Sequence, residues 1–496
     1  MNTAGITASS PGAAAAGEQL LRLGGNAVDA AVATALASCV ADPCNTGLGG
    51  FGGHMIVAPP ERPAICIDFN VWAPLAALDG YRIEPRTGAS ASVIPNVVAG
   101  LSAALRDFGT KSWADVLEPA ITLAEDGFIC SATLRRALED VKSFSFVAEC
   151  FGFETMGNDL KIRQPKLADT LQRLASNGPQ WFYEGPIAAI GSRSLTEGGH
   201  PTTVSAWADA RDAVTIAPAP SMRLGAASIF SSPLCTSGSI CMFAALAAGH
   251  ALAATSGLDT AAAICRWTEL LAAAWSYRFG TKQGNSIANS EIEDWIERSA
   301  AFHASAPVTG DTGHTCHLNA VDKNGMMAAT TLTHGKLWFG GRWALPDTGI
   351  IMNYGGPALR DPAPKRRGTR GYGVTNMNPT IARLDDGAAI AIGSPGARRI
   401  ASIVGATLAR HLFAGMPLQR AIEHGRFHAE DRRHATFEFD RLPAGVRATA
   451  QGFFKSVESE QAADYYGPCT AIRRDNDGTL TLGLDNRWPG FGVLVA

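Results

Sequence analysis

The chain has 496 residues, of which 46% are hydrophobic and 18% charged, and its formal net charge at pH 7 is −3. This composition excludes an intrinsically disordered protein, and the nearly balanced charge gives no attraction to polyanions such as nucleic acids. The length by itself allows roughly two to four domains.

Two further features of the composition bear on location. The first residues lack the basic and apolar regions of a secretion signal. Ten cysteines without a compact framework predict buried or free thiols in a reducing compartment, so we expect a cytoplasmic protein.

We find no apolar run of about 18 residues free of charges and helix breakers, so we expect no membrane span.

The first predicted elements are two helices. Ser10 followed by Pro11 predicts a helix over 11–23, which the glycines after it end. Asn26 can cap the alanine-rich helix that follows, which reaches to about Val40. The apolar spacing later in the chain predicts helices over 113–126, 261–276 and 400–414 and short strands over 388–392 and 479–484.

A glycine-rich segment follows the second helix. Gly47, Gly49 and Gly52 match the dinucleotide-binding fingerprint letter for letter. The segment follows a helix and precedes a predicted strand at 54–57, which is the wrong order for a Rossmann turn. Close packing of the backbone is therefore favoured over nucleotide binding, and no cofactor is expected.

An Asn-Gly pair predicts a β-hairpin in the second half of the chain. Asn324 and Gly325 lie between two segments rich in β-forming residues. This pattern predicts strands over 316–323 and 326–333 joined by a two-residue turn.

The predicted register brings polar groups together at the start of the first strand. Cys316 would face Thr333, and Thr315 would face His334. A hydroxyl would thus lie beside a second hydroxyl and an imidazole. The side chain of Cys316, one residue further on, should leave the opposite face of the strand.

Thr315 is the candidate nucleophile, since no Gly-x-Ser-x-Gly elbow for a serine occurs in the chain. A threonine can be activated by its own free α-amine, whose pKa of about 7.7 to 8 suits it as a base near neutral pH. This requires a cut between His314 and Thr315. The alternative interpretation is a strand threonine hydrogen-bonded to its neighbours.

The turn at 393–397 is a candidate oxyanion site. It follows a predicted strand and precedes a predicted helix, so consecutive backbone N–H groups can point into a pocket near a positive helix end. An ordinary glycine-containing turn between strand and helix is the alternative.

A basic segment and a pair of histidines are explained without nucleic-acid or metal binding. The segment 357–373, with a basic cluster at 365–370, is typical of a loop, either solvated or at the rim of an acidic substrate's site. His424 and His428 have the spacing of metal ligands, but no third ligand is evident, so a structural role is favoured and no metal is expected.

Several segments, in the same order along the chain, resemble the γ-glutamyltransferase family. The similarity extends from about residue 4 to residue 430. The segments that carry it are 23–32, 46–53, 109–113, 119–121, 124–128, 315–322, 347–353, 376–380 and 393–396.

The resemblance implies an N-terminal-nucleophile hydrolase with a mixed α/β, four-layer αββα fold. Members are made as one inactive chain that cuts itself at the catalytic threonine. Here the products would be a large-subunit segment 1–314 and a small-subunit segment 315–496, both forming one globular domain.

The resemblance also implies roles for individual residues. Thr315 matches the nucleophile, and Thr333 matches a threonine that hydrogen-bonds it. Gly396 and Ala397 match two glycines whose N–H groups bind the oxyanion, and the alanine departs from the pattern while keeping its N–H. The matching substrate-binding positions are Asn353, which lines the site, and Thr375 and Asn376, where the family has two serines that contact the substrate carboxylate. The family uses no metal.

Two departures concern the substrate. Asn70 occupies the position where family members that recognise γ-glutamyl groups have an arginine for the α-carboxylate. The segment 354–358 lacks the amide and acidic residues that bind the α-amine. An uncharged amide cannot make a bidentate, charge-assisted contact, so a different small acyl amide is a serious possibility.

We therefore expect an autoprocessing amidohydrolase or acyltransferase. Its partners would be a γ-glutamyl compound or another small amide, water or an amine acceptor, and its own two segments, with no nucleic acid and no membrane. One alternative is an amidase or biosynthetic hydrolase on a non-glutamyl substrate. The other is an uncleaved homologue without catalysis, which intact mass would distinguish.

Overall fold

The computed structural model describes residues 3–74, 87–234, 236–277, 314–356, 365–367, 370–372, 375–431, 433–459, 465–488 and 490–496. The chain forms two compact units. The first unit comprises Met1–Ala217, Gly313–Val374 and Phe491–Ala496, and the second comprises Pro218–Thr312 and Thr375–Gly490. Each unit contains chain from both sides of the predicted cut before Thr315. The division into segments 1–314 and 315–496 stays a prediction.

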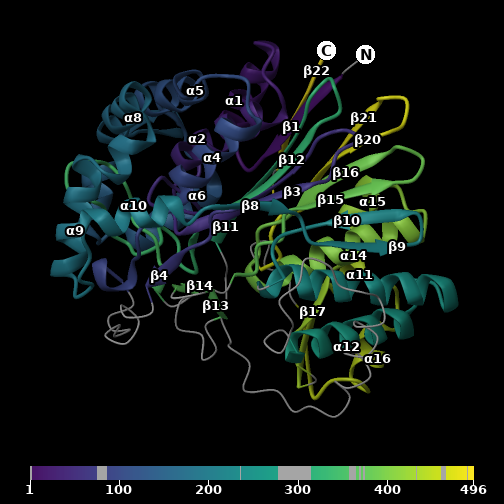
Figure 1. The fold of residues 1–496 in the computed structure, drawn as a ribbon. Helices are drawn as coiled ribbons and strands as arrows, with labels where there is room; N and C mark the ends of the chain where they lie inside the picture. Colours follow the sequence, from purple (N-terminus) through teal and green to yellow (C-terminus); the bar gives the residue numbers. More distant parts are fainter. Residues whose placement is uncertain are drawn as a thin grey trace. The chain divides into compact units, whose positions relative to one another are not determined.

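The first unit is built on a seven-stranded sheet in the order β22-β1-β11-β12-β2-β3-β8. Figure 1 shows β22 beside β1, with the two chain termini close together, and the Thr3 N–H donates to the Val495 carbonyl at 2.9 Å. The strands are β1 (Ala4–Ala8), β2 (Gly52–Ala58), β3 (Ile65–Asp68), β8 (Thr215–Pro218), β11 (His314–Val321), β12 (Met327–Gly335) and β22 (Phe491–Val495).

Helices α1 (Pro11–Arg22), α2 (Ala27–Ala41) and α4 (Val97–Phe108) pack against this sheet. The unit also contains α5 (Trp113–Asp126), α6 (Ala132–Val141), α7 (Ser145–Cys150), α8 (Pro165–Tyr183), α9 (Pro186–Glu197) and α10 (Val204–Asp212). Two three-stranded sheets complete the unit, one of β5 (Phe128–Ile129), β7 (Asp159–Arg163) and β6 (Gly152–Met156), the other of β13 (Lys365–Arg367), β14 (Arg370–Tyr372) and β4 (Trp72–Pro74).

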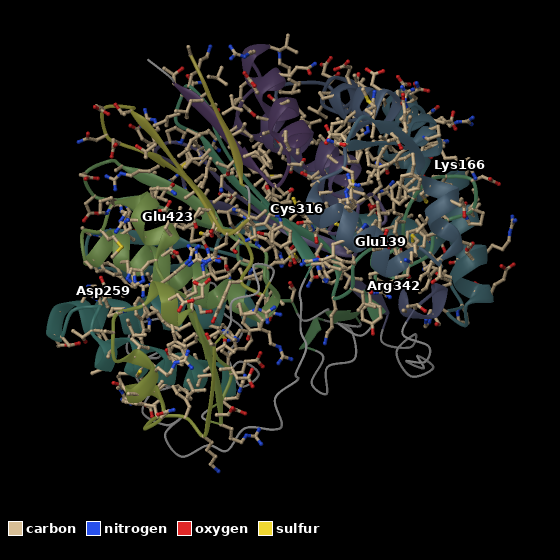
Figure 2. All side chains as sticks on the ribbon, turned by 180° about the vertical axis from the view of Figure 1, so that it is seen from behind. Glu139, Lys166, Asp259, Cys316, Arg342 and Glu423 are labelled. Atoms are coloured by element: carbon tan, nitrogen blue, oxygen red, sulfur yellow. The ribbon has the colours of Figure 1, made fainter. Side chains whose placement is uncertain are left out.

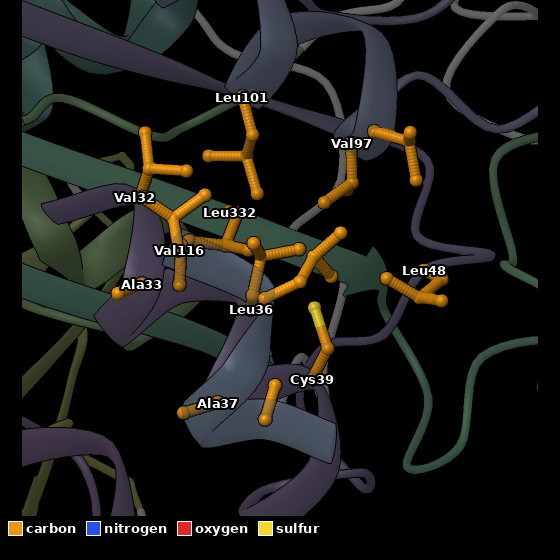
Figure 3. Packing of buried hydrophobic residues seen from close by; sticks show 14 of the residues in the cluster. Val32, Ala33, Leu36, Ala37, Cys39, Leu48, Val97, Leu101, Val116 and Leu332 are labelled. Carbon is orange, nitrogen blue, oxygen red and sulfur yellow. The ribbon is translucent and has the colours of Figure 1, made fainter. Parts of the chain in front are cut away.

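Helix α2 is the centre of the first unit's core. All of its residues are buried, which suits a helix that is apolar on every side. Figure 3 shows Leu36 and its neighbours on α2 against Leu101 of α4, Val116 of α5 and Leu332 of β12. The one charge on the helix, Asp29, is stabilised by hydrogen bonds from the N–H groups of residues 26, 110 and 111 and from the Thr110 hydroxyl.

The second unit has a six-stranded sheet in the order β21-β20-β16-β15-β10-β9. Its strands are β9 (Ser221–Leu224), β10 (Ala227–Phe230), β15 (Thr380–Leu384), β16 (Ala389–Gly393), β20 (Thr470–Arg474) and β21 (Leu480–Leu484). The unit's helices are α11 (Ser237–Thr255), α12 (Ala261–Tyr277), α14 (Ile400–Phe413), α15 (Leu418–Glu423) and α16 (Val446–Ala450), and a small sheet contains β17 (Phe427–Ala429), β18 (His434–Phe437) and β19 (Ser456–Ser459). Apolar residues of α11 and α14 share one core with those of the sheet.

The predicted helices and strands are largely confirmed. The Ser10 hydroxyl accepts from the Ala13 N–H, and Asn26 and Asp29 form a reciprocal capping box, so both predicted N-caps are confirmed. Helices α5, α12 and α14 and strands β16 and β21 lie within about a residue of their predicted bounds.

The glycine segment packs as predicted. A Cβ atom on Gly49 would lie 2.2 Å from the Ile351 carbonyl oxygen, and one on Gly53 would lie 2.5 Å from that of Thr331. The segment runs directly into β2. Close backbone packing therefore explains these glycines.

One prediction of local structure was wrong. Within the predicted loop 357–373, the short strands β13 and β14 pair with each other, and β14 also pairs with β4. Residues 357–364, 368–369 and 373 lie outside the described part of the chain. In α11, the window Gly238–Thr255 has a mean hydropathy of 1.5 and, although it contains two glycines, is long and apolar enough to cross a membrane. This is weak evidence for a span, because 61% of the window is buried, as in a core helix.

The hairpin register was also wrong by one residue over 316–321, although His314 pairs with Gly335 in the predicted register. Val321 pairs with Met327, and Cys316 faces Leu332 rather than Thr333. The cause is the Asp322 carboxylate, whose Oδ1 accepts from the N–H groups of residues 324 and 326 at 2.9 and 3.1 Å. The Asp322 N–H donates to the Met326 carbonyl at 3.1 Å, so the connection has three residues, 323–325, instead of two.

Candidate functional site

Thr315 lies in an irregular part of the hairpin. His314 pairs with Gly335 and Cys316 with Leu332, so two residues of β12, Thr333 and His334, lie opposite the single residue Thr315. This is a β-bulge, a feature often found next to active sites. Thr315 is buried, with 7% of its surface exposed.

The Thr333 hydroxyl contacts the bond that is predicted to be cut. It donates to the carbonyl oxygen of His314 at 2.5 Å and accepts from the Gly335 N–H at 2.8 Å. The second bond orients the hydroxyl so that its proton points at the carbonyl. A donor here polarises the carbonyl and stabilises negative charge that develops on its oxygen. In the uncut chain the Thr333 hydroxyl thus bonds to His314 and Gly335 rather than to the Thr315 hydroxyl, and the predicted bond to Thr315 stays a prediction.

The imidazole of His334 is not a base for Thr315. The ring packs against the loop before Leu48, and a Cβ atom on Gly47 would lie 2.7 Å from it. Burial lowers the pKa of His334 to about 3, so the ring is neutral and weakly basic. The expectation from the hairpin alone, an imidazole beside the nucleophile, is corrected.

A buried row of polar side chains continues from Thr315 along the same face of the sheet. His317 Nδ1 lies 2.8 Å from Thr331 Oγ1, and its Nε2 lies 3.0 Å from Asn319 Oδ1. Asn319 Nδ2 donates to Thr7 Oγ1 at 3.0 Å. Burial lowers the pKa of His317 to about 4, so the network is neutral at pH 7.

Sequence reasoning missed this row, although a signal for it exists. Thr315, His317 and Asn319 alternate with apolar residues in a strand that is buried on both faces. Polar side chains at every second position of a fully buried strand indicate a hydrogen-bonded layer.

Cys316 leaves the opposite face, as predicted. Its sulfur lies 3.3 Å from the Ser9 Oγ, and burial raises the pKa of the thiol to about 12. A thiol with so high a pKa is a poor nucleophile at neutral pH. The nine described cysteines are all buried and free, which confirms the expectation of unpaired thiols for the described part of the chain.

Asn70 is fully buried near this row. Its N–H donates to Asp68 Oδ1 at 3.0 Å, and its carbonyl accepts from Asn96 Nδ2 at 3.1 Å. Asp68 also lies 3.2 Å from His54 Nδ1, and His54 faces Thr331 across the sheet. Asn70, at the position where the resemblance places an arginine, is thus part of a closely packed polar cluster.

Asn353 joins three parts of the first unit. Its Nδ2 donates to the carbonyls of Gly49 and Val93 at 2.8 and 2.9 Å, and its Oδ1 accepts from the N–H groups of Val93 and Gly355. All four hydrogen-bonding positions of the amide are therefore used within the protein. Its substrate-binding role stays a prediction beside this structural one.

The other four predicted site residues belong to the second unit. Gly396 has φ 128° and Ala397 has φ 52°, both in the region that favours glycine. An alanine held in this conformation is strained, and such residues cluster at functional sites. Successive N–H groups in this kind of turn form an anion-binding concavity, which supports the predicted oxyanion role.

Thr375 and Asn376 lie where the chain passes the first turn of α11. Thr375 Oγ1 accepts from the Met377 N–H at 3.0 Å, and the Thr375 carbonyl accepts from the Gly238 N–H at 3.3 Å. A Cβ atom on Gly238 would lie 2.3 Å from the Asn376 carbonyl oxygen. Asn376 is partly exposed and Thr375 is buried.

The two histidines with metal spacing have separate protein partners. His424 Nε2 lies 3.1 Å from Asp259, and His428 Nδ1 lies 3.1 Å from the Ser402 hydroxyl. Among the described residues, no group of three or more His, Cys, Asp or Glu side chains could hold a metal ion. The contacts fit the structural role predicted for this pair.

A family model described as gamma-glutamyltranspeptidase matches residues 13–494. The chain is 27% identical to Scoloptoxin SSD14 of Scolopendra dehaani, with 96% of this chain and 90% of the relative covered. It is 26% identical to a glutathione hydrolase proenzyme of Pseudomonas sp. (strain A14), with 84% and 79% covered, and 27% identical to the acylase ACY 1 proenzyme of Pseudomonas sp. (strain V22), with 99% and 93% covered.

Solved structures show the same fold. A cephalosporin acylase from Bacillus halodurans superposes with a TM-score of 0.82 at 20% identity, and 99% of this chain and 96% of that chain are covered. The fold is therefore the mixed α/β, αββα fold of the N-terminal-nucleophile hydrolases, as predicted. Figure 2 labels Cys316, which lies on β11.

Proposed function

The chain belongs to the γ-glutamyltranspeptidase family, and from that premise we propose that it matures by cutting itself between His314 and Thr315. The mature protein would then act as an N-terminal-threonine amidohydrolase or acyltransferase. Hydrolysis or transfer of an acyl amide is the chemistry that glutathione hydrolase and acylase relatives support. The observation that carries the proposal is the 2.5 Å hydrogen bond from the Thr333 hydroxyl to the His314 carbonyl.

Maturation would begin with attack of Thr315 Oγ on the carbonyl carbon of His314. Thr333 would hold the resulting oxyanion, and the C–N bond would break as the threonine nitrogen takes up the hydroxyl proton. The product is an ester between the His314 acyl group and Thr315 Oγ. Water then hydrolyses this ester, which leaves a carboxylate on His314 and a free α-amine on Thr315.

Turnover would reuse the same oxygen. The α-amine of Thr315 would take the hydroxyl proton as Oγ attacks the substrate amide, and would pass that proton to the departing amine. The N–H groups of Gly396 and Ala397 would hold the oxyanion, which the positive φ angles of this turn support. Water or an amine would then release the acyl group.

Two classes of acyl donor fit this chemistry, γ-glutamyl compounds and other small amides. An amidase acting on a non-glutamyl acyl group is the second candidate, and it is favoured by Asn70, where an uncharged side chain occupies the place of the family's arginine. The similarity to an acylase proenzyme and to a cephalosporin acylase agrees with this alternative. Localisation in the cytoplasm stays a proposal that rests on the free thiols.

Self-cleavage is the decisive test. Purified protein analysed by denaturing electrophoresis and intact mass should give two chains, one ending at His314 and one beginning at Thr315. Thr315→Ala should stay a single chain with an unchanged circular dichroism spectrum. A wild-type protein that remains folded and uncut through long incubation would leave the uncleaved, non-catalytic homologue as the better interpretation.

A further inference from the structure

The side chain of His314 lies against an aromatic wall. Its ring centroid is 4.9 Å from that of Trp338, with an angle of 37° between the planes. The guanidinium carbon of Arg136, on α6, lies 5.2 Å from the centroid of the Trp338 ring. His314 is 8% exposed, so its imidazole is well enclosed in the uncut chain.

The loop that presents Trp338 is held firmly. The next residue, Phe339, is fully buried, and its ring lies 5.5 Å from that of Phe146 and 5.9 Å from that of Phe151. Phe339 and Arg342 both have φ 57°, which costs energy in residues other than glycine. Arg342 pairs with Asp140 of α6 at 2.6 Å, and Figure 2 shows Arg342 in the same part of the first unit as Glu139. The surroundings therefore impose the conformation of this loop.

The two reactions of Thr315 pass through the same type of intermediate, an ester on Thr315 Oγ. In maturation, the His314 acyl group is an ester on Thr315 Oγ, and in turnover the substrate acyl group is an ester on the same oxygen. Both acyl groups must therefore lie within reach of the same surroundings. The surface that the His314 side chain contacts before the cut is a surface that the substrate's acyl group can contact after it.

We propose that Trp338 forms the acyl-binding wall of the mature protein and selects acyl groups that carry a flat, unsaturated ring close to the carbonyl. This inference rests on the proposed function and names its substrate class. An imidazole already packs against the indole there in a tilted arrangement, and aromatic pairs gain attraction beyond the area they bury. Asn70 agrees with this choice, because an aromatic acyl group needs no charged handle at that position.

Matched donors test the preference for a ring. Phenylacetyl-p-nitroanilide and cyclohexylacetyl-p-nitroanilide have similar size and the same leaving group, and differ in whether the ring is flat. For the cut wild-type protein, kcat/KM should be about two- to tenfold higher for the phenylacetyl donor. Trp338→Leu should reduce that ratio to near one. Trp181→Leu, a partly buried tryptophan on α8, is the control and should keep the wild-type ratio.

Maturation gives a second measurement that needs no substrate. His314→Phe keeps a ring against Trp338 and should cleave faster than His314→Leu, by about the same factor. The difference should vanish when both are combined with Trp338→Leu, because the double-mutant cycle isolates the contact between the two side chains. If Trp338→Leu does not fold, the comparison of the two His314 variants still decides.

The outcomes separate this inference from the proposed function. A protein that cuts itself and hydrolyses amides, yet shows no ring preference, or keeps the preference in Trp338→Leu, overturns the acyl wall alone. Equal cleavage rates for His314→Phe and His314→Leu would do the same. A chain that never cuts overturns both proposals.

Discussion

Thr333 and Ala397 differ in the atoms that they contribute. In the first unit, the site is made of side chains: the Thr333 hydroxyl on the His314 carbonyl and the buried row that includes His317. In the second unit, the turn at Gly396 and Ala397 offers backbone N–H groups in a conformation with positive φ. A side-chain site depends on residue identity, whereas a backbone site depends on conformation. Alanine can therefore replace a glycine in the second unit, while the first unit should not tolerate an exchange that removes the hydroxyl.

The largest effect is expected at Thr333. Thr333→Ala removes the donor to the carbonyl oxygen, and losing one such donor usually slows a reaction about a hundredfold or more. Both self-cleavage and turnover should slow, as measured by the time course of chain appearance and by kcat.

Two variants control for this change. Thr333→Ser keeps the hydroxyl and should retain most of the cleavage rate, and Thr122→Ala, on the exposed surface of α5, should cleave like the wild type. Wild-type rates in Thr333→Ala would show that the reaction does not depend on the Thr333 hydroxyl.

The next largest effect is expected from the missing charge at Asn70, which should weaken the binding of γ-glutamyl donors. A charge-assisted bond to a carboxylate contributes roughly 1.5 to 3 kcal/mol, so its loss weakens binding by about tenfold or more. We expect kcat/KM for γ-glutamyl-p-nitroanilide to be at least about tenfold below that of a family member that has the arginine. Efficient turnover of glutathione, with none of the simple amides, would instead mean that the family's substrate survives without the arginine.

The buried histidines of the first unit predict a dependence of stability on pH. Burial lowers the pKa of His317 to about 4, while an unfolded histidine titrates near 6.5. Between these values the unfolded chain binds more protons than the folded one, so stability falls as the pH falls from 6.5 towards 4. For this residue, each unit by which the pH falls in this window should lower the free energy of unfolding by about 1.4 kcal/mol.

Urea unfolding at pH 7 and pH 5.5 measures this slope. His317→Gln should reduce it, although His334, whose pKa burial lowers to about 3, contributes in the same direction. A slope that His317→Gln leaves unchanged would show that this histidine does not titrate as the network implies.

The smallest effect is expected at Ala397. Ala397→Gly relieves the strain of a non-glycine residue at φ 52° and should raise the free energy of unfolding by up to about 1 kcal/mol. Because the N–H remains, kcat/KM should change by less than about twofold. A large loss of activity would mean that the alanine side chain itself matters there.

Local signals in the sequence predicted much of the fold. The caps at Ser10 and Asn26 and the close packing of Gly49 depend on residues near in sequence or on a recognisable spacing. The hairpin register did not follow from the Asn-Gly pair, because the Asp322 side chain closes a longer turn. The contact between His314 and Trp338 depends on an irregular loop with positive φ angles, which no periodicity encodes.

The sheet of the first unit also decides what can happen to the two pieces after a cut. From one edge, its strands come from the small segment (β22), the large (β1), the small (β11 and β12) and then the large (β2, β3 and β8). Pulling the pieces apart would break the pairings of β22 with β1, of β1 with β11 and of β12 with β2. A cut protein should therefore migrate as one particle under native conditions, and its halves should not exchange between molecules. Its lifetime would be set by the rate of unfolding rather than by an association constant.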